Sequence, residues 1–498
     1  MLFTRCSGVL LHPTSFPGRY GIGDLGHHAF QFIDFLAHSQ QRLWQVLPLG
    51  PTGLENSPYM CFSAMAGNPL LISPEQLYKD GFLEANDFDN LPTFTSDRIH
   101  FNQVTRVKYP LFHKAYERFQ INATSNQRHA FEQFCHEKAE WLEDFALFMA
   151  IKRYKQGISW SSWEPELAER EATAIAACRE TLSAQIQFEK FLQFEFFRQW
   201  SEVKKYANTY GVQIIGDIPI YVAHDSADVW ANPKNFCLNP DTHQPALLAG
   251  TPPDFFSQTG QLWGNPVYDW NYLQQSDFQW WVQRFQAMLD YVDVIRIDHF
   301  PGFAHFWAIP ENETDARKGK WISAPGEQFF QTLEQKLDTL PILAEDLGII
   351  TPDVEALRDK YQFPGMKILH FAFADPASPY LPFKYQPNCV VYTGTHDNDT
   401  TVGWFNSLGK EEQQNVLKYL GCTSSDGIHW DLIRLIFSSI ANLAIVPLQD
   451  ILGLDSDARM NTPGKQQGNW EWRYEENALT DEICDRLKDM TEFFYRAK

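Results

Sequence analysis

Three carboxylic acids in this sequence each follow a short apolar run, and the pattern suggests chemistry on a glycosidic bond. Asp298 ends VDVIRID, Glu345 ends PILAE, and Asp397 follows CVVYT within TGTHDND. They are separated by 47 and 52 residues (345 − 298 and 397 − 345), about one strand–helix unit with its loop. Cleavage of a glycosidic bond needs two carboxyl groups that flank the bond. A third carboxylate could bind the distorted sugar, so the set fits this chemistry better than any one member does.

Asp298 is the candidate nucleophile of the set. Arg296 lies two residues before it, and side chains two apart on a strand share one face. A guanidinium beside a carboxylate favours its ionised form, and an ionised, oriented carboxylate suits nucleophilic attack. The alternative is a structural Arg–Asp pair that closes one layer of a barrel.

Glu345 is the candidate general acid. Leu343 and Ala344 make its approach apolar, and Asp346 follows directly. An apolar site with a carboxylate nearby favours the protonated form of a glutamic acid, which is the form that donates a proton. The alternative is a glutamate that caps the next helix.

The third site combines Asp397 with two polar neighbours. His396 precedes it, and Asp399 follows closely. Histidine and aspartate in a loop can hydrogen-bond the vicinal hydroxyls of a sugar. A metal site is the competing functional interpretation, although no partner cluster is obvious elsewhere in the chain. A helix N-cap is the structural interpretation.

The elements that must position these acids form a regular series of short apolar strands and helical patterns. The expected strands are Gly8–His12, Leu43–Leu47, Val212–Asp217, Val292–Asp298, Ile342–Glu345, Met366–Phe371, Cys389–Thr393 and Leu443–Pro447. The clearest helices are Phe188–Tyr206, Gln279–Tyr291, Glu327–Leu337 and Ser425–Asn442. Eight such strands alternating with helices predict an α/β fold, a (β/α)₈ TIM barrel whose active site lies at the C-terminal strand ends. A doubly wound open sheet is the alternative, but no GxGxxG follows an early strand.

Two stretches between the strands are longer than a crossover helix requires. We expect a mostly helical insertion at about 51–205, which includes an amphipathic helix around Ala139–Lys155. A second insertion at about 219–280 is rich in Pro, Gly and aromatic residues and is predicted to form long loops. No repeat, low-complexity tract or linker divides the chain, so residues 1–498 are predicted to form one catalytic barrel domain.

The composition excludes several classes of partner. The 498-residue chain has 41 Lys and Arg against 62 Asp and Glu, a net charge of −21. Such an acidic surface argues against nucleic acid and anionic membranes as main partners, and no apolar run is long enough to span a bilayer. The eight cysteines are scattered without a CxxC pair, which predicts reduced thiols. The N-terminus lacks a signal-peptide pattern, so a cytoplasmic location is expected.

Longer segments spread along nearly the whole chain add to this picture. The first half contains SGVLLHPTSFPGRYGIGDLG, SPYMCFSAMAGNPLLI, GDIPIYVAHDSADVWANP and GTPPDFFSQTGQLWGNPVYDW. The second half contains DVIRIDHFPGF, ILAEDLG, TGTHDND and ARMNTPGKQQGNWEWR. Together these segments resemble the 4-α-glucanotransferases of glycoside hydrolase family 77, also called amylomaltases or disproportionating enzymes. The length fits the compact form of that family, and departures such as Met60 and Met65 do not touch the catalytic pattern.

The resemblance implies a function and a set of site residues. The function would be retaining transfer of an α-1,4-glucan segment to the 4-hydroxyl of glucose or another glucan, with malto-oligosaccharides as donors and acceptors and no cofactor or metal. Asp298 would be the nucleophile, Glu345 the acid/base and Asp397 the transition-state stabiliser, with the first two carboxyl groups about 5–5.5 Å apart. The matched positions that would bind glucan or support the carboxylates are Tyr59, Asp217, Asp254, Gln261, Trp263, Arg296 and His396. A turn aspartate before a proline is the alternative for Asp217.

The segment at 250–264 is the predicted lid of this site. Its prolines stiffen it, and Phe255, Phe256 and Trp263 could cover the site and stack on glucose. A closed site would favour a sugar acceptor over water. The alternative is that these aromatic residues anchor a long loop to the surface.

Two other functions remain open at the level of sequence. An α-amylase-like hydrolase would share the first half of the reaction and differ only in using water as the acceptor. A non-catalytic glucan-binding protein on a barrel scaffold would leave all three carboxylates idle. The sequence is compatible with a monomer or a small homo-oligomer.

Overall fold

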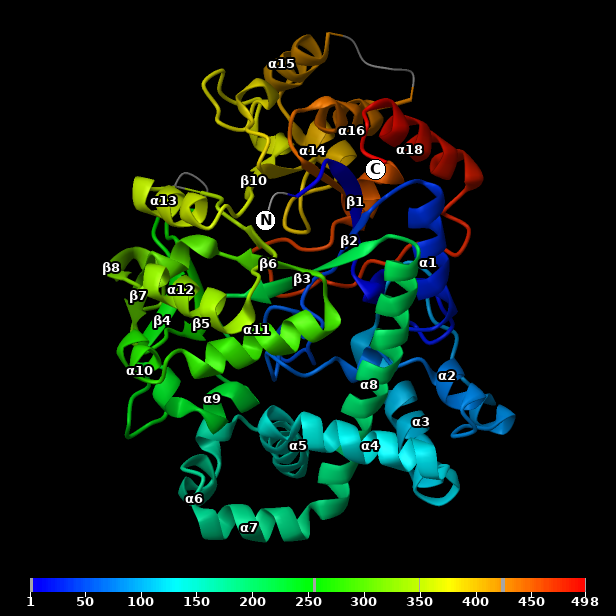
Figure 1. The fold of residues 1–498 in the computed structure, drawn as a ribbon, viewed down its shortest axis with the longest axis vertical. Coiled ribbons are helices and arrows are strands. Elements are labelled where there is room, and N and C mark those ends of the chain that lie inside the picture. The colour runs from blue at the N-terminus through cyan, green and yellow to red at the C-terminus, as the bar shows by residue number, and fades with distance from the viewer. Residues whose placement is uncertain (1–2, 254–256, 349, 422–425, 498) are drawn as a thin grey trace.

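A closed barrel of parallel strands forms the centre of the molecule (Figure 1). The computed structural model describes residues 3–253, 257–348, 350–421 and 426–497. The barrel strands, in order around the ring, are β1 (Cys6–Leu10), β2 (Leu43–Gln45), β3 (Gln213–Pro219), β6 (Val294–Asp298), β9 (Ile342–Ala344), β10 (Gly365–Ile368), β11 (Cys389–Tyr392) and β12 (Leu443–Pro447). Each overlaps one of the eight expected strands, so the predicted (β/α)₈ barrel is confirmed.

Apolar side chains fill the interior of this barrel. Alternate residues of a strand point to opposite sides, so each strand contributes to two cores. Ile215, Val294 and Met366 belong to the inner cluster, whereas Ile214 and Ile295 belong to the larger cluster that also includes the surrounding helices. The interior is therefore a packed core, and the C-terminal strand ends are where a site can form.

Helices follow the barrel strands at most of the crossings and after the last strand. They are α1 (His27–His38), α8 (Ser183–Thr209), α11 (Gln279–Tyr291), α12 (Gly326–Leu337), α13 (Pro352–Lys360), α14 (Thr401–Ser407), α15 (Lys410–Leu420), α16 (Ile428–Ser438), α17 (Leu448–Ile451) and α18 (Asp481–Phe493). The four clearest helices predicted from sequence overlap α8, α11, α12 and α16. Between β10 and β11 the chain forms the short 3-10 helices η9 (Leu369–Phe371) and η10 (Pro382–Lys384) instead.

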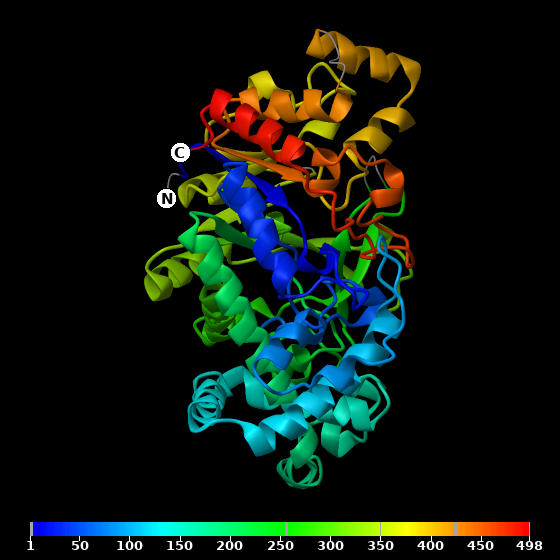
Figure 2. The ribbon, with the colours of Figure 1, turned by 90° about the vertical axis from the view of Figure 1, so that its right-hand side faces the viewer.

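A group of helices between β2 and β3 lies at one end of the molecule (Figures 1 and 2). They are α2 (Pro74–Lys79), α3 (Phe101–Asn122), α4 (Ser125–Glu137), α5 (Ala139–Tyr154), α6 (Pro165–Ala168) and α7 (Ala172–Thr181). The long helix α8 joins them to the barrel, because it packs on α4 and α5 and also on α1, α11 and β3. The helical content expected here is present, whereas the division of the chain into one domain with insertions stays a prediction.

The stretch 219–280, which is expected to form long loops, also contains short helices and strands. It contains α9 (Ala227–Ala231), α10 (Trp270–Gln275), β4 (Leu247–Thr251) and β5 (Gln261–Pro266). The two strands join β7 (His305–Pro310) and β8 (Lys320–Ser323) in an antiparallel sheet of order β5-β4-β7-β8. β4 and β5 are short and contain glycine, and β4 pairs with β7, which follows the barrel strand β6. Short, partly exposed strands that contain glycine leave only a weak signal in the local sequence.

Two further expectations concern the membrane and the cysteines. Within the residues that the structure describes, no helix combines the length and apolarity that crossing a membrane requires. The thiols of Cys6, Cys61, Cys135, Cys178, Cys237, Cys389 and Cys484 are all free. Cys422 lies outside the described residues.

Candidate active site

The ends of β6 and β9 place two of the predicted carboxylates side by side. Ile297 pairs with Ala344 in the parallel register, so the next residues, Asp298 and Glu345, lie opposite each other. Neighbouring strands are about 4.8 Å apart, which sets the separation of the two backbones. The backbone N–H of Glu345 donates to the carbonyl of Ile297 over 3.0 Å and extends this pairing past the end of β9.

A buried guanidinium joins two carboxylates beside this pair. Arg296 lies opposite Asp217 in the β3–β6 register, and its Nη1 donates to Asp217 Oδ1 and Oδ2 over 2.8 and 2.7 Å. The same nitrogen donates to Asp298 Oδ1 over 2.9 Å. Tyr59 adds a hydroxyl bond of 2.8 Å to Asp217 Oδ2. Burial raises the pKa of Asp217 to about 6, and Arg296 opposes that rise. The cluster holds one oxygen of Asp298 in a fixed place.

Glu345 occupies a more enclosed position than Asp298. Its Oε2 accepts the backbone N–H of His299 over 2.6 Å, and its Oε1 accepts that of Leu347 over 2.9 Å. Burial raises the pKa of Glu345 to about 8, and the charge of Asp298 adds to the rise. At neutral pH the protonated form is therefore favoured, which is the direction expected from the apolar sequence before it.

The charge that raises the pKa of Glu345 is that of Asp298, and not that of Asp346, which follows Glu345 in the sequence. Asp346 turns away: its Oδ1 accepts the backbone N–H of Met366 over 2.6 Å, and its Oδ2 pairs with Arg358.

On the neighbouring strand, the residue after Asp298, His299, adopts a left-handed backbone with φ of 54°. A non-glycine residue in this region stores strain, which is found at functional sites. The strained residue is the one that donates its N–H to Glu345.

The loop after β11 brings Asp397 to the same end of the barrel. Its Oδ1 accepts Asn461 Nδ2 over 2.6 Å, and its backbone carbonyl accepts Arg459 Nη2 over 2.6 Å. His396 Nε2 lies 3.4 Å from the same carboxylate oxygen. The side chain of Asp397 is 47% exposed, so an oriented carboxylate remains open to a ligand.

Tyr59 connects this loop to the buried guanidinium. Its ring stacks on that of His396 with 5.2 Å between centroids and 17° between planes, and Trp470 packs against both rings. Burial raises the pKa of Tyr59, and the charges of Asp217, Asp298 and Asp397 all add to the rise. One phenol therefore has three of the predicted carboxylates around it.

Part of the predicted lid borders the site. Trp263 on β5 meets the ring of His299 edge to face with 4.9 Å between centroids, and Tyr221 lies 6.2 Å away. The indole Nε1 donates to Gln261 Oε1 over 3.1 Å. Gln261 is exposed. Asp254, Phe255 and Phe256, which the sequence places in the lid, lie outside the described residues.

Sequence reasoning missed three residues that hold the carboxylates. Asn461 and Arg459 lie more than 60 residues beyond Asp397, and only the ARMNTPG segment pointed to them. His299 directly follows Asp298, but its backbone N–H and not its ring binds Glu345. A long-range side-chain contact and a backbone donor are features that local residue patterns do not reveal.

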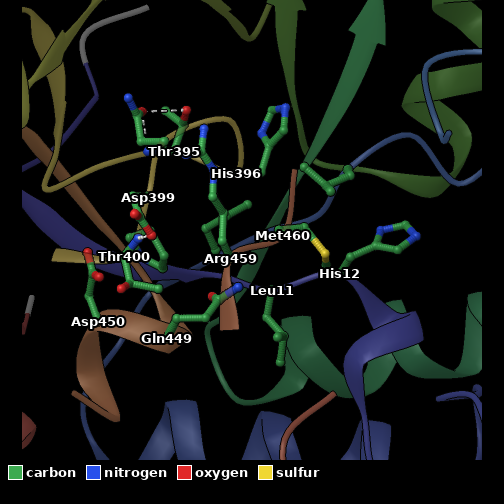
Figure 3. A pocket seen from close by; sticks show the side chains of 14 residues that line it. Leu11, His12, Thr395, His396, Asp399, Thr400, Gln449, Asp450, Arg459 and Met460 are labelled. Atoms are coloured by element: carbon green, nitrogen blue, oxygen red, sulfur yellow. Dashed lines mark hydrogen bonds between the residues drawn. The ribbon is translucent and has the colours of Figure 1, made fainter. Parts of the chain in front are cut away.

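Two hollows lie beneath these residues. One runs below the loop that bears His396, with His12 and Met460 on one side and Asp399, Thr400 and Asp450 on the other (Figure 3). The other is lined by residues that include Tyr59, Asp217, Tyr221, Arg284 and Tyr291. Among the described residues, no group of three or more His, Cys, Asp or Glu side chains could hold a metal ion.

The fold and the site define a class of protein. A closed (β/α)₈ barrel has neighbouring carboxyl groups of different electrostatic character at its C-terminal face, with a third carboxylate beside them. Barrel enzymes that act on glycosidic bonds have these features.

Comparison with known proteins narrows the class to one family. The profile of glycoside hydrolase family 77, described as 4-alpha-glucanotransferase, matches residues 11–480. The 4-alpha-glucanotransferase of Synechocystis sp. is 55% identical over 499 residues, which cover 100% of this chain and 99% of the relative. That of Thermus thermophilus is 45% identical over 500 residues, 99% of each chain. An amylomaltase structure from Streptococcus agalactiae, in complex with acarbose, superposes with a TM-score of 0.96 at 39% identity and 99% coverage of both chains.

The chain belongs to the 4-alpha-glucanotransferase family, glycoside hydrolase family 77. Its members named above are transferases, and glucan transfer is the function that this membership supports. The comparisons do not favour the alternative, an α-amylase-like hydrolase, over glucan transfer.

Proposed function

We propose that this protein transfers a segment of an α-1,4-glucan to the 4-hydroxyl of glucose or of another glucan, with retention at the anomeric carbon. The main support is the contrast between two neighbouring carboxyl groups. Asp298 is ion-paired to Arg296 at 2.9 Å, whereas burial raises the pKa of Glu345 to about 8. One group is suited to attack and its neighbour to proton donation, as a retaining double displacement requires.

The first step forms a sugar ester. A carboxylate oxygen of Asp298 attacks the anomeric carbon, and the bond from that carbon to the glycosidic oxygen breaks. Glu345 gives its proton to the departing oxygen, so the leaving glucan has a free non-reducing 4-hydroxyl. The enzyme then holds a covalent glycosyl ester on Asp298 and an ionised Glu345.

The second step passes the sugar to the acceptor. The 4-hydroxyl of glucose or of a malto-oligosaccharide attacks the anomeric carbon, and Glu345 takes the hydroxyl proton. The ester bond breaks and Asp298 returns as a carboxylate. Two inversions give net retention, and Glu345 ends the cycle protonated, so no cofactor or metal enters the balance.

The other residues orient the groups that react. We assign Asp397 to binding the distorted sugar and stabilising the positive charge that develops on it, with Asn461 holding one oxygen at 2.6 Å. Arg296, itself paired with Asp217, holds the carboxylate of Asp298 in place. The stacked rings of Tyr59 and His396 line the site next to this cluster. Charged groups that are fixed before the reaction need no reorganisation during it.

The acceptor preference depends on the lid in this proposal. Trp263, with its ring edge against His299, lies where it could cover the sugar ester and keep water from it. Gln261 and Asp254 are assigned to glucan contacts along the same segment. The substrates and partners proposed are uncharged α-1,4-glucans rather than nucleic acid or membrane, for a cytoplasmic enzyme that is a monomer or a small homo-oligomer.

Incubation of the purified protein with maltotriose tests the proposed transfer. Transfer gives glucose together with a ladder of glucans longer than maltotriose, because each donor segment is passed to another sugar. Products that are all shorter than maltotriose would instead identify a hydrolase. Asp298→Asn should abolish both kinds of product, and full activity in that variant would refute the catalytic assignment.

A further inference from the structure

One buried carboxylate anchors both ends of the loop that bears His396 and Asp397. The loop leaves β11 at Thr393 and enters α14 at Thr401. Thr393 Oγ1 donates to Asp450 Oδ2 over 2.5 Å. Thr401 donates its hydroxyl to the same oxygen over 2.7 Å and its backbone N–H to Oδ1 over 2.6 Å. Both oxygens of Asp450 are therefore engaged by the two ends of one loop.

The burial of Asp450 makes these bonds costly to lose. The residue lies in α17 after β12 and is 1% exposed. Burial raises its pKa, and the hydrogen bonds from Thr393 and Thr401 oppose that rise. A buried carboxylate is tolerated only when its oxygens are satisfied, and charge-assisted hydrogen bonds are shorter and stronger than neutral ones. We therefore expect Asp450 to hold both ends of the loop firmly in place.

His370 contacts Thr401, one of the two threonines that bind Asp450. Its Nε2 lies 3.0 Å from Thr401 Oγ1, whose proton goes to Asp450, so the histidine donates to that oxygen. Burial lowers the pKa of His370 to about 3, which keeps the ring neutral. The ring stacks on Trp404 at 4.4 Å, and a Cβ at Gly394 would lie 2.7 Å from it. Gly394, near the start of the loop, therefore packs closely against the ring.

The span between the anchors is itself tied together. Asn398 Oδ1 accepts the backbone N–H and the hydroxyl of Thr395, both over 2.9 Å, and so closes a turn around His396 and Asp397. A span that is rigid in this way moves as a unit. A shift at either anchor would therefore be passed on to both side chains.

We propose that Asp450 is a positioning residue for the transfer reaction, because it fixes the loop on which Asp397 meets the sugar. The inference rests on the role proposed above for Asp397. A displacement of about 1 Å at a reacting group can cost about 100-fold in rate, so a loosened anchor should lower kcat even though Asp450 does not touch substrate.

Thr393→Val tests this with little change of shape, because valine keeps the branched side chain and loses only the hydroxyl. The matched control is Thr491→Val on α18, where another buried hydroxyl donates to the Leu487 carbonyl over 2.6 Å and accepts from Gln41 over 2.8 Å. Both variants should lower the midpoint of thermal unfolding. With α-maltosyl fluoride as donor and maltose as acceptor, T393V alone should lower kcat for fluoride release, by about 10-fold.

A double-mutant cycle with Asp397→Asn separates positioning from general damage. If the anchor acts mainly through Asp397, T393V should cost much less in the D397N background than in the wild type. The same fold-loss in both backgrounds would overturn the inference, as would a kcat of T393V equal to that of T491V. Wild-type kcat in D397N alone would instead overturn the proposed role of Asp397, so the two failures are distinguishable.

Discussion

At the scale of single residues, the three carboxyl groups of the site differ in their partners and in their exposure. Asp298 shares the guanidinium of Arg296 with Asp217, whereas the buried Glu345 accepts two backbone N–H groups. Asp397 is held by an amide and stays half exposed. Ion pairing thus suits Asp298 to attack, and burial suits Glu345 to proton transfer. The exposure of Asp397 suits it to binding the sugar.

The raised pKa of Glu345 predicts a basic limb in the pH profile. A pKa of about 8 means that the proton is held below that pH and lost above it, so kcat/KM for a glucan donor should fall about tenfold per unit above about pH 8. α-Maltosyl fluoride has a leaving group that needs no proton, so its first step should lack this limb. Profiles of both donors measure the difference, and an identical limb with both would contradict proton donation by Glu345.

At the scale of elements, the barrel was predictable and the second sheet was not. The eight barrel strands are apolar runs that are buried on both faces, and this leaves a strong signal in the sequence. β4 and β5 are half exposed and contain glycine; β5 pairs with β4, and β4 pairs with β7, which lies beyond β6 in the sequence. The carboxylates were found because each ends a barrel strand or follows one. Asn461 and Asp450 were missed because they act over more than 45 residues of chain.

The second sheet gives the lid a role that can be tested. β5 holds Trp263 beside His299, so Trp263→Ala should raise the ratio of hydrolysis to transfer several-fold or weaken glucan binding. Trp321→Ala on β8 of the same sheet is the control, since that side chain is 52% exposed. Glucose release from maltotriose, compared with longer products, measures the ratio. Unchanged ratio and affinity in W263A would remove the role of the lid.

At the scale of the whole molecule, the two chain ends meet to close the barrel. Arg496, fully buried after α18, donates to the carbonyls of Cys6 on β1 and Asn442 before β12. Arg5 donates to the Ser439 and Ala441 carbonyls beside them. These bonds lie at the start of the strands, whereas the reactive groups lie at their ends. The barrel therefore keeps its stabilising contacts on one face and its chemistry on the other.

The central claim is that a glucan passes through a covalent ester on Asp298, and trapping that ester tests it most directly. Glu345→Gln with α-maltosyl fluoride should form the ester, because fluoride leaves without a proton, and should retain it, because no base activates the acceptor. Mass spectrometry of the quenched, digested protein should find maltosyl on the peptide that contains Asp298. Fluoride release without any adduct, or an adduct on a different carboxylate, would contradict the account.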